Sequence, residues 1–372
     1  MKILYLITKS TTGGAQTHIY QMSKYFIGEK NKVAVMSQSG GALEQKVEEL
    51  GVLFFLNQFF SNNLNFFKIF KAIKEIKRVV REFKPGLISC HSTAAGFLGR
   101  LAIKNKVPTI FTAHGWSFNP NVSWGKRILA FWSEKIVSPY SSKIICVSDF
   151  DKELAVKYKV YPREKLKVIH NGVKIQEKRE SFFSSLEPGK IRIVFVGRLN
   201  KQKDPMLLVR VFNDLEAELK NKTDVSIIGD GPKKWELEKF IRKNNLEKKI
   251  KLLGDLPQKE VFKILRESHL FVLTSNWEGF PRSILEAMSF GLAVVASDVG
   301  GVRESVSEEN GILIKKGDEE SFKNALERLL KNPSLVEKMG REGWRKARDE
   351  FFLEKMFKET ESLYESILEN KN

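Results

Sequence analysis

The chain has 372 residues, of which 42% are hydrophobic and 29% charged, and its formal net charge is +18. This length predicts two domains of about 150 to 200 residues, and the composition excludes a disordered or fibrous protein. Residues 1–175 carry 27 Lys and Arg against 11 Asp and Glu, whereas residues 176–372 carry 36 against 34. The first half is therefore expected to bind anionic lipid, nucleic acid or a pyrophosphate-bearing substrate. The alternative is that the proteins of the source organism are generally rich in lysine.

The amino-terminal segment MKILYLITKS resembles a signal peptide in its lysine and short apolar run. Five apolar residues are too few for such a signal, so the segment predicts a first β-strand instead. Because no stretch approaches the roughly 18 to 20 apolar residues of a membrane-spanning helix, any membrane contact is expected to be peripheral. Cys90 and Cys146 lie inside apolar runs typical of buried strands, which favours free thiols and a reducing, cytoplasmic compartment.

Short apolar runs alternate with longer amphipathic stretches along the first half of the chain. This pattern is typical of parallel strands covered by helices on both faces. The predicted strands are 2–7, 33–37, 52–56, 86–90, 109–113 and 143–147.

The same pattern starts again after a polar segment. We interpret that segment, 174–190 with its Pro188-Gly189 pair, as an exposed linker between two Rossmann-like domains, 1–175 and 176–354. The amphipathic stretch 351–372 is expected to form a helix that crosses back to the first domain. The second series of predicted strands is 191–197, 224–229, 250–254, 270–275, 293–297 and 311–314. Ligands of such sheets bind at the carboxyl ends of the strands, in the cleft expected between two facing sheets.

Two strand-end loops combine glycine with features suited to phosphate. Gly13 and Gly14 follow the first strand and precede a helix, where backbone N–H groups favour an anion. Gly197 and Arg198 end the first strand of the second domain, and Lys203 follows five residues after the arginine. The guanidinium of an arginine and the ammonium of a lysine can bind a diphosphate together. The alternative for the glycine pair is an ordinary turn, and the alternative for the loop with Arg198 and Lys203 is a solvated basic loop.

The segment 275–304 carries the most specific pattern. Glu278 follows a predicted strand, and a turn at 279–281 leads into a helix that carries Glu286. Two carboxylates eight residues apart in a strand–turn–helix can point toward one ligand and accept hydrogen bonds from vicinal hydroxyls.

Residues 191–304 resemble the donor domain of glycosyltransferase family 4, whose signature is the Glu-x7-Glu pattern that Glu278 and Glu286 form. Nearly the whole chain is similar to this family. The other matching segments are GGAQTH at 13–18, AHGW at 113–116, VSDF at 147–150, VIHNGV at 168–173, VGRLNKQKD at 196–204 and IGDGP at 228–232. The resemblance implies an α/β protein with the two-domain GT-B fold, and a retaining transfer from a nucleotide-sugar donor, with UDP the expected nucleotide.

The resemblance also implies roles for single residues. Arg198 and Lys203 would bind the donor diphosphate, with Gly197 in the same loop, and Glu286 would bind the ribose hydroxyls. Glu278 would hold the transferred sugar, with backbone amides of Gly279 and Phe280. His114 would contact the sugar or the reacting centre, and Gly14 would approach the phosphate from the other domain.

No Asp-x-Asp segment at a strand end is interpreted as a divalent-metal site, so no metal ligand is assigned and Arg198 and Lys203 are expected to take the place of a cation. Retention of configuration comes from the family alone. Because the first domain offers no clear carboxylate nucleophile, front-face attack is favoured over double displacement.

Two segments of the first half suit an acceptor held at a membrane. The stretch 63–85 is an amphipathic basic helix whose apolar face would either lie on an anionic bilayer or, the favoured interpretation, pack on the sheet. The stretch 116–136 places Trp116, Trp124 and Trp132 among basic residues, as expected at a membrane interface or an acceptor entrance. Together with the positive charge of the first half, the resemblance to the family implies a lipid-linked saccharide acceptor of bacterial surface-polysaccharide synthesis.

The sequence is less consistent with three other classes of protein. A nucleic-acid-binding protein fits the pI but lacks a recognisable module. A nicotinamide-dependent oxidoreductase lacks the G-x-G-x-x-G pattern after either opening strand. A nucleotide-sugar epimerase or phosphorylase of the same fold would not need a lipid-facing surface.

Overall fold

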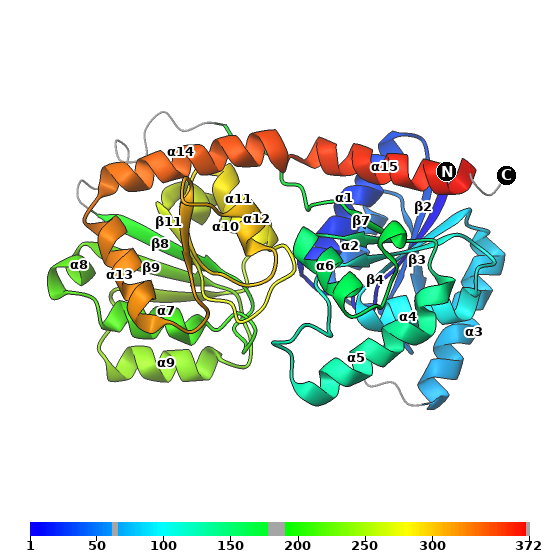
Figure 1. Cartoon of the computed structure of the whole chain (residues 1–372), viewed down its shortest axis with the longest axis horizontal. Helices are drawn as coiled ribbons and strands as arrows, with labels where there is room; N and C mark the ends of the chain where they lie inside the picture. The colour runs from blue at the N-terminus through cyan, green and yellow to red at the C-terminus, as the bar shows by residue number, and fades with distance from the viewer. Residues whose placement is uncertain (62–65, 178–189, 370–372) are drawn as a thin grey trace. The chain divides into compact units, whose positions relative to one another are not determined.

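The computed structural model describes residues 1–61, 66–177 and 190–369. The chain divides into two compact units, one made of Met1–Asn171 and Glu354–Asn372 and the other of Gly172–Leu353. Each unit is a parallel sheet between layers of helices (Figure 1). Most of the predicted linker, residues 178–189, lies outside the described residues.

The first unit has a parallel sheet in the order β3-β2-β1-β4-β5-β6-β7. Its strands are β1 (Lys2–Leu6), β2 (Lys32–Ser37), β3 (Leu53–Leu56), β4 (Leu87–His91), β5 (Thr109–Ala113), β6 (Lys143–Cys146) and β7 (Leu166–Val168). The order reverses direction after β3, which places β1 beside both β2 and β4. The six strands expected in this half are confirmed. The seventh, β7, was not predicted, because three residues with an exposed lysine in the middle give no apolar run.

Helices cover both faces of this sheet (Figure 1). They are α1 (Gly14–Gly28), α2 (Ala42–Glu48), α3 (Phe66–Phe83), α4 (Thr93–Ile103), α5 (Trp124–Val137), α6 (Asp149–Lys157) and α15 (Leu353–Glu369). Cys90 and Cys146 are buried and unpaired. Burial raises the pKa of the Cys90 thiol to about 12, so this cysteine stays protonated and unreactive at neutral pH.

The second unit has a parallel sheet in the order β10-β9-β8-β11-β12-β13. Its strands are β8 (Ile191–Val196), β9 (Thr223–Ile228), β10 (Ile250–Gly254), β11 (Leu270–Leu273), β12 (Ala293–Ser297) and β13 (Gly311–Ile314). The helices that cover it are α7 (Pro205–Asn213), α8 (Ala217–Asn221), α9 (Lys234–Lys243), α10 (Gln258–Glu267), α11 (Arg282–Ser289), α12 (Val302–Ser305), α13 (Glu319–Leu330) and α14 (Pro333–Glu350). All six predicted strands are present, and the predicted fold class is confirmed.

Polar side chains buried between α4 and α5 join these two helices. Arg100 donates from Nη1 and Nη2 to the two carboxylate oxygens of Glu134, at 2.9 Å each, and Tyr161 donates to the same carboxylate at 2.6 Å. Both charged side chains are buried, so each needs the other to offset its loss of hydration. The pair therefore fixes α5 against α4, although α5 also has an exposed face.

The helix α15, at the end of the chain, packs on the first unit. The Phe357 ring stacks on Tyr25, whose hydroxyl donates to Glu361 at 2.6 Å. Tyr364 is fully buried and donates to Ser89 Oγ on β4 at 2.9 Å. The last helix thus contributes a hydrogen bond to the centre of the first sheet.

Replacing Tyr364 with phenylalanine is expected to lower the free energy of unfolding by about 1 kcal/mol, because one buried hydrogen bond is lost at nearly constant volume. Urea denaturation followed by circular dichroism measures the change. Tyr140→Phe, at a half-buried tyrosine in the same unit, is the matched control. Equal unfolding midpoints for the two variants would contradict the prediction.

Candidate active site

Three histidines meet at the carboxyl edge of the first sheet. His91 is the last residue of β4, His114 directly follows β5, and His18 lies in the second turn of α1. Their ring centroids are 5.1 to 5.4 Å apart, and His91 Nδ1 lies 2.9 Å from His114 Nε2. His114 is half-buried, whereas His18 and His91 are buried. The sequence pointed only to His114, because its two partners come from a neighbouring strand and from a helix that are far away along the chain.

A chain of hydrogen bonds runs from α15 to His114. Tyr364 donates to Ser89 Oγ, and Ser89 Oγ lies 3.1 Å from His91 Nε2. With Tyr364 as its donor, the Ser89 hydroxyl is left to donate to Nε2. His91 then carries its proton on Nδ1 and donates it to His114 Nε2, so we infer that His114 carries its own proton on Nδ1.

Burial lowers the pKa of His91 well below 6.5, and the neighbouring His114 and His18 add to this effect. A histidine whose pKa is lower in the folded state binds its proton more readily when the chain is unfolded. The stability it contributes is therefore complete above pH 6.5 and is lost as the pH falls from 6.5 toward the lowered pKa.

We expect the free energy of unfolding to decrease by up to about 1.4 kcal/mol per pH unit below 6.5 because of His91. Unfolding measured in urea between pH 5 and pH 8, for the wild type and for His91→Asn, tests this. The variant should lose stability less steeply with acid. Parallel pH profiles would mean that His91 does not titrate on unfolding.

Gly14 is the first residue of α1 and is exposed, and Gly13 precedes the helix without a side-chain cap. The structure therefore places the predicted glycine pair at a helix N-terminus on the same sheet edge as the histidines. The amides of a first helical turn have no partner within the helix and can face an anion.

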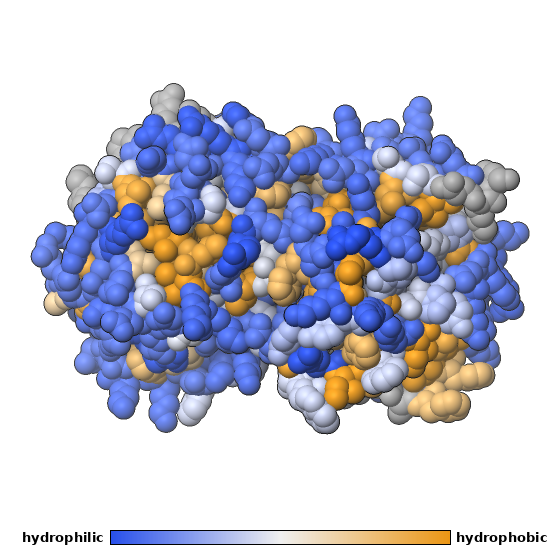
Figure 2. All heavy atoms as spheres, viewed as in Figure 1, coloured by the Kyte–Doolittle hydropathy of each residue, from blue (hydrophilic) through white to orange (hydrophobic). Residues whose placement is uncertain are grey.

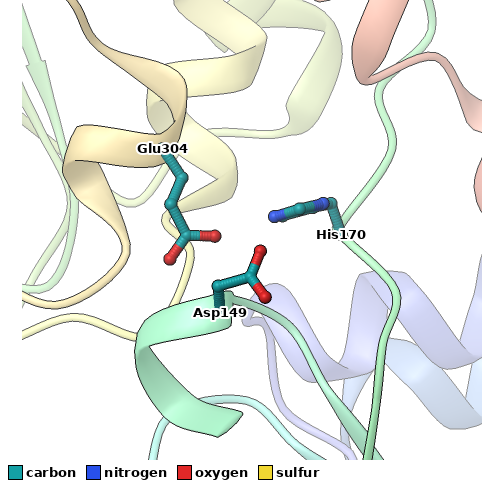
Figure 3. Close-up of side chains that lie close together, drawn as sticks. All are labelled: Asp149, His170 and Glu304. Carbon is teal, nitrogen blue, oxygen red and sulfur yellow. The ribbon is translucent and has the colours of Figure 1, made fainter. Parts of the chain in front are cut away.

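Asp149 and His170 come from two further segments of the first unit, 147–150 and 168–173, whose sequences resemble the family. Asp149 begins α6, His170 follows β7, and their ligand atoms lie within 4.8 Å of each other (Figure 3). One carboxylate and one imidazole are fewer ligands than a protein metal site normally has. Glu304, also labelled in Figure 3, belongs to α12 of the second unit and is not counted with them.

The loop after β8 carries the predicted diphosphate-binding residues of the second unit. Arg198 is exposed and makes no ion pair with any residue that the structure describes. The stem of Lys203 packs over Gly197, where an added Cβ would lie 3.4 Å from Lys203 Cδ. Because Gly197 has no side chain, the aliphatic part of Lys203 can lie directly against its backbone.

Lys203 and Glu278 are brought together. Lys203 Nζ lies 2.5 Å from Glu278 Oε1, and Ser275 donates to the same oxygen at 2.6 Å. The side chains of Lys203 and Glu278 are 17% and 7% exposed. The two opposite charges attract each other strongly because both side chains are largely shielded from water. Glu278 Oε2 takes no part in this contact and can accept a hydrogen bond from a ligand.

Hydrogen bonds between two loops hold this pair in place. Asn276 donates its backbone N–H to Gln202 O at 2.7 Å, and Gln202 Nε2 donates to Trp277 O at 3.1 Å. Thr274 Oγ1 donates to the carbonyl of Asp204 at 2.8 Å. Sequence reasoning missed these positioning residues, because an isolated Gln, Asn or Thr in a loop gives no signal of its own.

Two glycine loops also pack tightly against the strand ends. Gly229 has φ +130° and an added Cβ would lie 2.1 Å from Gly197 O. Gly300 has φ +58° and an added Cβ would lie 2.0 Å from Glu278 O, and the next residue, Gly301, donates to Gly279 O at 2.8 Å. Any side chain at position 229 or 300 would therefore displace the backbone that carries the candidate site.

Glu286 lies on α11, the helix that Gly279 and Phe280 precede, and it is half-buried. Burial raises the pKa of Glu286, and Arg282 one turn earlier opposes the rise. Phe280 is buried against Phe351, with ring centroids 5.2 Å apart. The aromatic ring is thus part of the core, so any ligand contact of Phe280 falls to its backbone.

The prediction for the three tryptophans of 116–136 was wrong for one of them. Trp116 is 4% exposed, stacks on Phe118 at 4.8 Å and donates from Nε1 to Asp151 O at 2.8 Å. Trp116 lies three residues after the end of the buried strand β5, and its side chain belongs to the core. Trp124 and Trp132 on α5 are exposed, as expected. Among the described helices, none combines the length and apolarity that crossing a membrane requires.

Two units, each with a parallel sheet between layers of helices, are the architecture of GT-B glycosyltransferases. Comparisons with known proteins agree. The family described as "Glycosyltransferase Family 4" matches residues 12–177, and the family described as "Glycosyl transferases group 1" matches residues 177–346. The chain thus combines a glycosyltransferase family 4 region with a glycosyltransferase group 1 region, and it is a glycosyltransferase.

Relatives cover most of the chain. An Escherichia coli UDP-Gal:alpha-D-GlcNAc-diphosphoundecaprenol alpha-1,3-galactosyltransferase is 28% identical over 355 residues, 90% of this chain and 89% of its own. The Escherichia coli O-antigen biosynthesis glycosyltransferase WbnH is 27% identical over 85% of this chain and 86% of its own. Anabaena HepE in complex with UDP-glucose has the same fold, with a TM-score of 0.83, 21% identity, and coverage of 98% of this chain and all of that one.

Proposed function

We propose that this enzyme transfers a sugar from a UDP-sugar to a lipid-linked saccharide, with retention of the anomeric configuration. The observation that carries the proposal is the contact between Lys203 and Glu278, two residues far apart in sequence that meet at the strand ends of the second unit. Lys203 supplies a positive charge for the departing phosphate, and Glu278 accepts hydrogen bonds from sugar hydroxyls. Their contact therefore brings the group that binds the phosphate next to the group that binds the sugar.

The donor is proposed to bind along the strand ends of the second unit. Arg198 and Lys203 contact the diphosphate, where fixed cations stabilise the charge that grows as the bond breaks. Glu286 accepts hydrogen bonds from the ribose hydroxyls. The residue is half-buried, a position that suits hydrogen bonds to uncharged hydroxyl groups. Glu278 binds the transferred sugar. UDP is favoured as the nucleotide because the galactosyltransferase relative is named for it.

In the proposed step, the bond between the anomeric carbon and the β-phosphate oxygen breaks and a bond to the acceptor oxygen forms on the same face. The phosphate oxygen that leaves takes the acceptor proton, so no further reactant is needed. His114 contacts the sugar near the reacting centre, with its ring held by His91. Gly14 at the start of α1 approaches the donor phosphate.

The acceptor proposal rests on two supports. The relative named for a diphosphoundecaprenol-linked acceptor aligns over nine-tenths of this chain, and the excess positive charge lies in the first half. A lipid-linked acceptor would keep the enzyme at a membrane as a peripheral protein, because a carrier lipid stays in the bilayer. The cytoplasmic face is proposed because the free thiols of Cys90 and Cys146 favour a reducing compartment.

Thermal-shift screening against UDP, GDP, ADP and their common sugar conjugates tests the proposal. A ligand that binds only the folded state raises the melting temperature by mass action. We expect a selective rise with UDP or a UDP-sugar that is weaker in Glu286→Ala. A rise with another nucleotide alone would contradict the UDP assignment, and no rise with any nucleotide would contradict the donor site.

Activity is expected to survive EDTA, because Arg198 and Lys203 provide the positive charge at the diphosphate. Release of UDP in the presence of a UDP-sugar and acceptor, with and without EDTA, measures this. A loss of turnover in EDTA that magnesium or manganese restores would refute it.

A further inference from the structure

A groove lies between α3 and the end of α4 in the first unit. Its volume is about 400 Å³. The apolar part of its wall consists of Phe70, Ile73, Val80, Ala102 and Ile103. The cationic part consists of Lys74, Lys77, Arg81 and Lys106. An apolar channel bordered by four cations suits a ligand that is itself amphiphilic and anionic.

The sequence of α3 explains why this groove stays open. The residues Ala72, Ile76, Val79 and Phe83 recur at helical spacing and are buried in the core. A second apolar stripe, Phe66, Phe70, Ile73 and Val80, recurs at similar spacing about a third of a turn away around the helix. Core packing was expected for the whole apolar face of this helix. Ile73 and Val80 of the second stripe are partly buried against the core, whereas Phe66 and Phe70 are 87% and 64% exposed.

The charges along the groove have one sign. No carboxylate lines it among the residues that the structure describes. The acidic residues of α3, Glu75 and Glu82, both lie against Arg78, at 3.0 and 2.9 Å. Across the described part of the chain, Lys74, Lys77 and Arg81 have no ion-pair partner, so their charge is available to an anion.

Exposed apolar side chains also lie on α5, which packs on α4 beside α3. α4 packs between α3 and α5, and α5 exposes Trp124, Leu129 and Trp132 while its Glu134 is held by Arg100. Figure 2 shows apolar atoms at the lower right of the molecule, over the surface that α3 and α5 occupy in Figure 1. Exposed apolar side chains with tryptophans and cations nearby are typical of a membrane-facing patch.

We propose that the α3–α4 groove binds an anionic phospholipid of the bilayer, with the headgroup phosphate on Lys74, Lys77 and Arg81 and an acyl chain along Phe70 and Ile73. This inference deepens the proposed function, on whose membrane-bound acceptor it rests. The groove lies at the end of α4, about 16 Å along the helix from its start beside His91. It is therefore an anchoring site, separate from the histidine cluster.

Vesicle sedimentation tests the proposal with the full chain and two triple variants. Lys74→Gln/Lys77→Gln/Arg81→Gln removes the charge of the groove. Lys259→Gln/Lys263→Gln/Arg266→Gln removes the same charge from exposed positions on α10 of the second unit. The vesicles contain phosphatidylcholine alone, or phosphatidylcholine with about one-third phosphatidylglycerol.

We expect binding to the anionic vesicles only. The groove triple variant should weaken binding to these vesicles about 100-fold, the loss expected when three cations are removed from an anionic surface. The α10 triple variant should weaken the same binding by less than about threefold. Equal losses in both triples would show general electrostatic attraction and overturn the site. Absence of wild-type binding to anionic vesicles would overturn it as well.

Two further measurements separate a lipid site from a phosphate site. Phe70→Ser should weaken vesicle binding at constant charge, whereas Trp235→Ser, at an exposed tryptophan of α9, should not. Inorganic phosphate at 10 mM should not release the protein; release would indicate a site for free phosphate and contradict the proposal. The thermal shift with UDP should persist in the groove triple, so that loss of membrane binding is distinguished from failure of the donor site.

Discussion

Replacing Glu278 with glutamine is expected to lower kcat/KM for sugar transfer by about 10²- to 10³-fold, the range measured when one preorganised polar contact to a transition state is removed. The glutamine keeps the shape of the side chain but loses the charge that faces Lys203 at 2.5 Å. One amide N–H group of glutamine would point at the lysine or at the sugar, so the lysine also loses its fixed position. Initial rates with saturating acceptor and varied donor measure the effect.

The double variant Glu278→Gln/Lys203→Met tests whether the two residues act as a unit. Because they are in contact, the combined loss should be clearly smaller than the product of the single losses. Glu308→Gln, at an exposed carboxylate of the same unit, is the control and should keep wild-type rates. If the Glu278 variant also kept wild-type rates, the assignment of the sugar site would be wrong.

His114→Ala is expected to lower kcat by about 10²-fold or more, because a positioned imidazole beside the reacting centre supplies contributions of this size. The ring lies 2.9 Å from His91, which in turn is linked to Ser89 and Tyr364. The orientation of His114 should therefore depend on the donor that His91 presents. Turnover measured with saturating donor and acceptor reports this effect.

Two variants of His91 separate positioning from packing. His91→Asn keeps an N–H donor near the position of Nδ1 and should retain activity within about tenfold, whereas His91→Phe keeps the ring volume without a donor and should lose about as much as the His114 variant. KM for the donor should change less than kcat. Equal kcat values for the two variants would show that the hydrogen bond to His114 does not matter for turnover.

Much of the second unit could be predicted from sequence. Its six strands are short apolar runs, and Gly197, Lys203, Glu278 and Glu286 follow strand ends at spacings that are visible along the chain. Their common location follows from topology, since the carboxyl ends of parallel strands meet at one edge. The contact between Lys203 and Glu278 did not follow, because it depends on hydrogen bonds between two loops.

The first unit shows more clearly what could not be predicted from the sequence. Its strands and the position of His114 were predictable, but Trp116 and the apolar face of α3 were each assigned to the wrong environment, at least in part. A tryptophan or a phenylalanine contributes the same hydrophobicity to a sequence pattern whether it is buried or exposed. Only the packing partners decide between the two.

The sequence by itself determined the α/β class, the division into two parallel sheets and the family, because these depend on periodicity and on motifs read along the chain. The tertiary structure alone decided which side chains meet. It joined His18, His91 and His114 from a helix and two strands, seated Glu278 against Lys203, and left one stripe of α3 in a cationic groove. These contacts bring together residues that are distant in sequence, and their geometry is set by the packing of whole elements rather than by any local pattern.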